Sequence, residues 1–335
     1  MTGTSQYRIG LALAAAAFLL WSTALAVAQQ PRVRALKYDA DRKTWVEVPP
    51  PPPGTPEGDL HVIRALIKDA KYRQALAEVK AHVKRYGQSH PLYPEVLIAK
   101  AEALVGKRAY DKAHVTLQTF LGEFAGLAAT SDALRLEFTV AEAYLSGAKR
   151  KVWGILRLSG EDVAFGILDE ISTDYPDSEF AELAVKTKGD YLFRKGEHAL
   201  AELEYARVLR DHPQSRYHQY SLRRTAESAL ASFAGVDYDE SGLIEAEERY
   251  RDYRARYAAT SDHEGVGTML EGIQELRAEK EFSTGRYYER TDHLSSAVYY
   301  YRLVRDDWPG TIAADKATSR LELLGAMEPV SSTGG

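Results

Sequence analysis

The sequence from Gly285 to Thr311 reads GRYYERTDHLSSAVYYYRLVRDDWPGT. Within it, Ala297 lies twelve residues before Pro309, and Tyr301 lies eight residues before it. This spacing is typical of two antiparallel helices: a small residue lets the partner helix approach, a larger one fills the next turn, and proline ends the second helix. The stretch therefore predicts a helix pair.

The same spacing occurs six times along the chain. An alanine lies twelve residues before the proline, or before the residue that replaces it, in every copy: Ala75, Ala113, Ala164, Ala201, Ala246 and Ala297. A larger apolar residue follows four positions later: Val79, Leu117, Leu168, Tyr205, Tyr250 and Tyr301. A Ser or Thr commonly lies two residues after the proline position, where it is placed to cap the next helix, as in Ser178, Ser215, Thr260 and Thr311.

The repeats determine how many domains we expect. A length of 335 residues suggests two domains, but one repeat cannot bury its apolar face alone, and stacked copies share one core. We therefore predict an all-α solenoid of five to six helix pairs over residues 58–325, with a closing helix at Ile312–Leu324. We expect residues 326–335 to form a disordered tail.

Composition excludes several kinds of chemistry. The chain has no cysteine, which excludes disulfides, thiolate metal sites and thiol catalysis. The net charge of −5 argues against a nucleic-acid binder that works by bulk phosphate neutralisation. No H-E-x-x-H, G-x-S-x-G or phosphate-loop motif occurs, so we predict a protein that is not an enzyme.

The N-terminus has the pattern of a secretory signal. Arg8 precedes the apolar run Ile9–Trp21, and Ala26-Val27-Ala28 forms a small-residue cleavage site, so residues 1–28 predict a signal peptide and export. The alternative is an uncleaved membrane anchor, because Ile9–Ala28 is close to the length that spans a bilayer. Residues 29–57 predict a proline-rich linker, in which 36–39 and 45–48 pair as a small hairpin.

The basic segment Lys149–Leu158 interrupts the third helix pair. Trp153 and its basic neighbours predict peripheral contact with a membrane surface or binding to a partner groove. The alternative is a loop whose apolar side folds back onto the solenoid.

Residues 237–248 resemble the calcium loop of an EF-hand. Aspartates or serine occupy positions 1, 3 and 5 of the twelve-residue loop, Gly242 occupies position 6, and a glutamate occupies position 12. The predicted calcium ligands are Asp237, Asp239, Ser241, the Leu243 carbonyl, Glu245 and Glu248. A single calcium ion of this kind would brace the repeat. The alternative is an acidic lead-in that favours the start of the next helix.

Two copies carry a longer pattern that resembles the tetratricopeptide repeat: Gly189, Leu192, Ala201, Tyr205 and Pro213, then Gly285, Tyr288, Ala297, Tyr301 and Pro309. The closing segment, from Tyr287 to Ala314, is similar to the BamD/ComL outer-membrane assembly factors. This resemblance implies a non-catalytic scaffold in the periplasm or at the periplasmic face of the outer membrane. Its implied partners are outer-membrane assembly subunits and unfolded barrel segments.

The chain departs from that family where the signal ends. Family members carry a lipidated cysteine there, whereas this sequence has Ala26-Val27-Ala28-Gln29. Two other functions stay open at this point: a general envelope or cell-division adaptor, braced by calcium, and an envelope hydrolase with a catalytic carboxylate in a deep cleft.

The repeat register places the predicted partner-binding residues on the first helix of two pairs, where a solenoid presents its concave face. They are Lys186, Asp190, Phe193 and Arg194 in the fourth pair, and Phe282, Arg286, Glu289 and Arg290 in the sixth. Charged groups beside aromatic rings suit peptide recognition.

Overall fold

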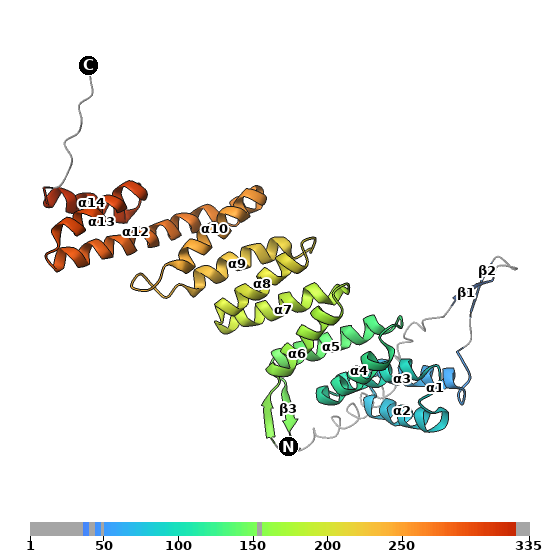
Figure 1. Cartoon of the computed structure of the whole chain (residues 1–335). Coiled ribbons are helices and arrows are strands. Elements are labelled where there is room, and N and C mark those ends of the chain that lie inside the picture. Colours follow the sequence, from blue (N-terminus) through green and yellow to red (C-terminus); the bar gives the residue numbers. More distant parts are fainter. Residues whose placement is uncertain (1–35, 40–43, 48–49, 153–155, 326–335) are drawn as a thin grey trace, which may run out of the picture. The chain divides into compact units, whose positions relative to one another are not determined.

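The computed structural model describes residues 36–39, 44–47, 50–152 and 156–325. It divides into two compact units, Met1–His61 and Val62–Gly335 (Figure 1). The described residues form fourteen helices and two small hairpins. The predicted signal peptide, the tail and Trp153 lie outside the described residues.

The first unit contains an antiparallel hairpin of β1 (Leu36–Asp39) and β2 (Thr44–Glu47), with Leu36 opposite Glu47. The predicted hairpin is confirmed, with its second strand one residue earlier than expected. Helix α1 (Pro56–Lys68) begins in this unit and continues into the second. It starts two residues before the predicted boundary, because proline at the first helical position fits the helical φ and loses no hydrogen bond there.

The second unit is a row of helices in which sequence neighbours pack on one another. After α1 come α2 (Tyr72–Tyr86), α3 (Tyr93–Gly106), α4 (Tyr110–Phe124), α5 (Thr130–Leu145), α6 (Glu161–Asp174), α7 (Glu179–Lys195), α8 (His198–Asp211), α9 (His218–Ser232), α10 (Ser241–Arg256), α11 (Ala258–His263), α12 (Val266–Arg290), α13 (Leu294–Asp307) and α14 (Ile312–Leu323). The repeated alanines lie on α2, α4, α6, α8, α10 and α13, which gives six repeats and a closing helix, as predicted.

Burial confirms the repeat register. All six repeated alanines are 0% exposed, and the larger residues four positions later are 0–4% exposed. The prolines lie just beyond the ends of α6, α8 and α13. The spacing therefore marks the helix–helix contacts that build the core.

The segment that interrupts the third helix pair is a hairpin. Strands β3 (Lys149–Val152) and β4 (Leu156–Ser159) pair antiparallel between α5 and α6. Leu158 on this hairpin is 50% exposed, so its side chain does not fold back onto the helices. Arg150 instead forms an ion pair with Asp111 of α4, with Nε 3.1 Å from Oδ1.

The predicted capping residues also differ from one another. Thr311 caps α14, because its Oγ1 accepts the backbone N–H of Ala314 at 3.1 Å. Ser178 occupies the N-cap of α7 without a side-chain hydrogen bond to the helix. Ser215 precedes the N-cap residue of α9, and Thr260 lies inside α11.

Among the described residues, no helix combines the length and apolar composition needed to cross a bilayer.

Candidate partner-binding surfaces

The predicted binding residues on α7 are largely engaged inside the stack. Lys186 Nζ lies 2.6 Å from Asp190 Oδ2 and 4.6 Å from the centre of the Tyr220 ring. Asp190 Oδ1 accepts hydrogen bonds from the hydroxyls of Tyr205 and Tyr220, both at 2.7 Å. These contacts join α7 to α8 and α9, so Lys186 and Asp190 hold successive repeats together.

Electrostatics agrees with this structural role. Burial favours the neutral form of Asp190, but hydrogen bonds from Lys186 and the two tyrosines outweigh it and lower the pKa of the carboxyl below 3.8. Phe193 stacks against a guanidinium from α9, with Arg224 Cζ 3.6 Å from the ring centre. Of the four predicted residues on α7, only Arg194 is exposed and has no polar partner among the described residues.

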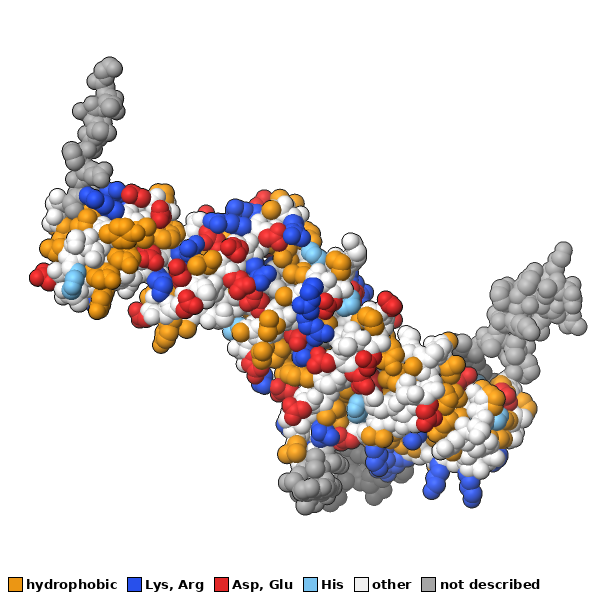
Figure 2. Space-filling view, in the orientation of Figure 1, with side chains coloured by type: hydrophobic (Ala, Val, Ile, Leu, Met, Phe, Trp, Pro, Cys, Tyr) orange, Lys and Arg blue, Asp and Glu red, His pale blue; other side chains and the backbone are white. Residues whose placement is uncertain are grey.

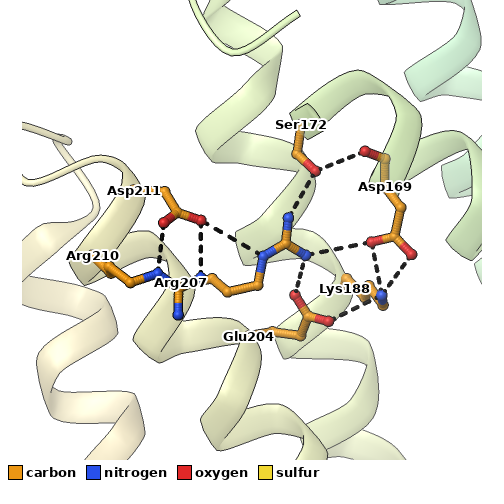
Figure 3. A network of polar contacts seen from close by, with 7 residues as sticks. All are labelled: Asp169, Ser172, Lys188, Glu204, Arg207, Arg210 and Asp211. Atoms are coloured by element: carbon orange, nitrogen blue, oxygen red, sulfur yellow. Dashed lines mark hydrogen bonds and ion pairs between the residues drawn. The ribbon is translucent and has the colours of Figure 1, made fainter. Parts of the chain in front are cut away.

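A second network ties α6, α7 and α8 together (Figure 3). Lys188 Nζ lies 2.8 Å from Asp169 Oδ1 and 3.0 Å from Glu204 Oε1. Arg207 Nη1 lies 2.9 Å from Glu204 Oε2, and Nη2 donates to Ser172 Oγ at 3.2 Å. Partly buried ion pairs that share hydrogen bonds in this way fix the angle between helices. This network is therefore part of the scaffold.

The predicted residues on α12 come together around one pocket. Phe282, Arg286, Glu289 and Arg290 line a cavity of about 480 Å³ with Arg320 of α14. The ring of Phe282 is buried, whereas Arg286 and Arg290 are exposed. We call this cavity the arginine pocket. Its four α12 residues follow from the repeat register, and Arg320 was not predicted.

A second pocket, which the sequence analysis missed, lies between α2 and α3. It has a volume of about 540 Å³, and we call it the α2–α3 groove; its lining residues are Leu76, Val79, Lys80, Val83, Lys84, Gln88, Tyr93, Val96, Leu97 and Lys100. The apolar residues Leu76, Val79 and Val83 follow helical spacing on α2, which is the signal that points to it. Lys80, Lys84 and Lys100 have no ion pair among the described residues.

The EF-hand-like segment, residues 237–248, is part loop and part helix. Helix α10 begins at Ser241, so Ser241, Leu243, Glu245 and Glu248 lie on helical turns instead of around a loop. Asp239 accepts hydrogen bonds from the Ser241 N–H and hydroxyl, as an acidic lead-in to the helix would.

Other groups occupy the positions around this segment. Lys280 Nζ donates to the carbonyl oxygens of Val236, at 3.3 Å, and Tyr238. Glu245 forms an ion pair with Arg249 at 2.6 Å. Within the described ranges, no three His, Cys, Asp or Glu side chains gather as a metal site would require. Calcium binding therefore stays a prediction that only solution measurements test.

The hydrolase alternative needs paired carboxylates in a cleft. Glu202 of α8 and Glu245 of α10 are such a pair, and burial together with the charge of Glu245 raises the pKa of Glu202 to about 7. Arg249 bridges the two, 3.1 Å from Glu202 and 2.6 Å from Glu245. Neither glutamate lines the arginine pocket or the α2–α3 groove. Arg249 lines a separate pocket of about 330 Å³ between α8, α9 and α10, and neither glutamate is among the residues that line it.

The surface is mixed in charge. On the face drawn in Figure 2, Lys and Arg side chains alternate with Asp and Glu along the second unit, and hydrophobic side chains form separate patches. A surface of this kind, with pockets between helices, is that of a tetratricopeptide-like scaffold for protein interactions.

Comparison with known proteins defines the family. Residues 156–324 match the family described as "YfiO: Outer membrane lipoprotein", and the chain belongs to this family. The match runs from β4 to the end of α14 and includes the arginine pocket. Membership indicates a protein of the cell envelope. No curated protein matches the chain.

Two solved structures are similar at 13% sequence identity. A tetratricopeptide repeat protein from Parabacteroides merdae aligns over 80% of this chain and 98% of its own, with a TM-score of 0.36. The C-terminal part of a TPR repeat-containing protein from Cytophaga hutchinsonii aligns over 77% of this chain and 98% of its own, with a TM-score of 0.24.

Proposed function

We propose that the chain is a non-catalytic periplasmic scaffold that binds partner proteins during the assembly of outer-membrane β-barrel proteins. Family membership supports the envelope location, and the stacked helix pairs support protein binding. The single observation that carries the binding role is the α2–α3 groove, an open apolar surface bordered by unpaired lysines.

The chemistry of this groove suits an unfolded barrel segment. Barrel strands alternate apolar and polar residues, so an extended strand presents an apolar stripe with polar side chains beside it. Leu76, Val83 and Leu97 offer apolar contacts to such a stripe. Lys80 and Lys84 lie beside them and are exposed, so they can pair with acidic side chains of the strand while staying hydrated.

Site-specific crosslinking tests the proposal. A photoreactive benzoylphenylalanine at Val83 lies in the groove, and the same residue at Val115, which is 65% exposed on α4, is the matched control. The full chain carrying either residue is expressed in an outer-membrane-containing bacterium, irradiated and purified. We expect crosslinks from Val83, and few from Val115, to β-barrel assembly subunits or nascent barrel proteins, identified by mass spectrometry.

Affinity capture of the unmodified chain from envelope extracts completes the test. Recovery of β-barrel assembly subunits supports the assembly role. Recovery of cell-division or peptidoglycan proteins in their place would show a general envelope adaptor. Crosslinking of equal strength from Val83 and Val115 would show that the groove is not the binding surface.

A further inference from the structure

The arginine pocket has a charge imbalance. Its lining contains three arginines and one glutamate. Glu289 is fully used, because Oε2 accepts from the Tyr301 hydroxyl at 2.6 Å and Arg320 donates to both of its oxygens. These hydrogen bonds lower the pKa of Glu289, so it stays ionised and paired with Arg320.

The remaining two guanidinium groups form no ion pair within the described part of the chain, although the charge of Arg286 contributes to the lowered pKa of Glu289. Arg286 and Arg290 lie one helical turn apart on α12, are exposed, and form no ion pair with the described residues. The nearby ammonium of Lys316 is already paired with Glu279, at 2.9 Å. The two guanidinium groups are therefore available to an anionic ligand, and the planar guanidinium matches a carboxylate with two parallel hydrogen bonds.

The floor of the pocket adds a second requirement. The Phe282 ring is 5% exposed and packs against Tyr301, with ring centres 5.4 Å apart. Its remaining exposed edge offers an apolar contact between the charged groups. A volume of about 480 Å³ falls in the range of specific ligand sites and is enough for a few side chains.

We propose that the arginine pocket binds a carboxylate-bearing segment of a partner protein, in which an apolar side chain next to the carboxylate contacts Phe282. Arg286 and Arg290 supply the hydrogen bonds to the carboxylate, and the Glu289–Arg320 pair positions α14 as the opposite wall. This proposal rests on the scaffold function and adds the chemical class of segment that one surface takes.

Peptide binding to the full chain tests the proposal. The probe is a fluorescein-labelled peptide ending in Leu-Glu-Leu-Glu, compared with the same peptide ending in Leu-Gln-Leu-Gln, each with a free and an amidated C-terminus. Fluorescence anisotropy gives the dissociation constants. We expect the glutamate peptide to bind at least tenfold more tightly, and the free and amidated forms show whether a side-chain or a terminal carboxylate is read.

Matched variants assign the binding to the pocket. Arg286→Gln with Arg290→Gln is expected to weaken the glutamate peptide at least tenfold, and the double lysine variant to weaken it less. Lys107→Gln with Arg254→Gln removes the same charge from exposed positions outside the pocket and is expected to change nothing. Melting curves verify that all three variants fold.

Several results would overturn the proposal. Equal binding of the two peptides, or unchanged binding by the Arg286 and Arg290 variant, would show that the pocket does not read a carboxylate. Arginine-dependent binding of phosphatidylglycerol vesicles without peptide binding would replace the partner with a lipid surface. If crosslinking from Val83 fails while this peptide binding holds, the assembly function fails and the pocket assignment stands. If crosslinking from Val83 succeeds while the peptide does not bind, the assembly function stands and the pocket assignment fails.

Discussion

The ring of Tyr301 lies so close to the backbone of Gly285 that a Cβ atom at Gly285 would be 2.7 Å from its Cε1 atom. Tyr301 is fully buried and its hydroxyl is hydrogen-bonded to Glu289, so the ring has no room to move aside. Gly189 has the same relationship with Tyr205, at 3.0 Å. The glycine and the tyrosine of the repeat therefore form one contact, in which the small residue admits the large one.

Gly285→Ala is expected to lower the free energy of unfolding by about 1–2 kcal/mol, because overpacking outweighs the gain in helix propensity. Gly272→Ala on the same helix is the control, since a Cβ there has no neighbour within 4 Å. That change is expected to raise stability by up to about 1 kcal/mol. Urea denaturation measures both. A stabilising Gly285→Ala would show that the ring moves freely.

The repeat contacts were predictable because they depend on residue size at fixed spacing. The alanines, the larger residues and the glycines each lie where the repeat register places them, and all six alanines are fully buried. Capping was predictable only in part: Thr311 caps α14 as expected, whereas Ser178 makes no such bond, because capping depends on backbone angles that spacing does not specify. The β3–β4 hairpin was not predicted, because the interpretation of Lys149–Leu158 rested on its basic and apolar side chains and did not consider strand pairing.

The binding surfaces were predictable only in part. The register places these residues on the concave face of α7, but Tyr205 of α8 also contacts Asp190. Tyr220 and Arg224 of the next repeat cover the same face and engage Asp190 and Phe193. The pair of α12 and α13 is followed by the closing helix α14, and the same register positions of α12 line an open pocket with Arg320 of α14. The α2–α3 groove was missed because the first repeat lacks the glycine and proline that made the later repeats recognisable.

Asp190→Asn is expected to lower the free energy of unfolding by about 2 kcal/mol, since the change weakens a charged acceptor of three hydrogen bonds. Because the folded pKa lies below 3.8, the carboxylate stabilises the fold above that pH and loses its contribution as the pH falls through the folded pKa. The deficit of the variant therefore shrinks in acid.

Arg194→Gln, on the same helix, is the control for Asp190→Asn. Its side chain is exposed and unpaired among the described residues, so stability is expected to change by less than about 0.5 kcal/mol. Chemical denaturation at neutral and acidic pH measures both variants. If Asp190→Asn leaves the free energy of unfolding unchanged, Asp190 does not hold the repeats together and is available to bind a partner.

Calcium is expected to leave the melting temperature unchanged relative to chelator. Residues 241–248 of the EF-hand-like segment lie on α10, and Lys280 already contacts the carbonyls of Val236 and Tyr238, so the ion would have to displace native contacts. A ligand that binds the folded state raises its stability by mass action. A rise in melting temperature that disappears in Asp237→Asn with Glu248→Gln would show that the segment rearranges into a calcium loop.

Thr311 before α14 and Ser178 before α7 allow helix capping to be tested. Thr311→Ala is expected to cost about 1 kcal/mol, because its Oγ1 accepts the Ala314 N–H. Ser178→Ala is expected to cost a few tenths of a kcal/mol at most, since Ser178 makes no such bond. Denaturation midpoints compare the two. Equal costs would show that Ser178 caps α7 in solution.

The pair of His114 on α4 and Glu137 on α5 predicts a pH dependence of stability. Glu137 is 1% exposed, and its carboxylate lies 2.9 Å from His114 Nδ1. Burial raises the pKa of Glu137. Burial of His114 acts to lower its pKa, but the hydrogen bond and charge of Glu137, with a contribution from Glu170, outweigh burial and Arg150 and raise it above 6.5.

Both raised pKa values make the folded state less stable as the pH rises. The contribution of His114 is fully present below the unfolded value of 6.5 and is lost as the pH rises through the folded pKa. The contribution of Glu137 is likewise lost as the pH rises above 4.5. Stability is therefore expected to fall as the pH rises above 6.5 and through the folded pKa of His114.

His114→Ala is expected to cost roughly 2 kcal/mol near pH 6, because it leaves Glu137 buried without its cationic partner. The cost is expected to shrink as the pH rises, since the native histidine loses its proton over the same range. His263 on α11, which is exposed and has no polar partner among the described residues, provides the control variant His263→Ala, whose cost is expected to be small. Parallel pH profiles for the wild type and His114→Ala would show that the histidine does not titrate within the fold.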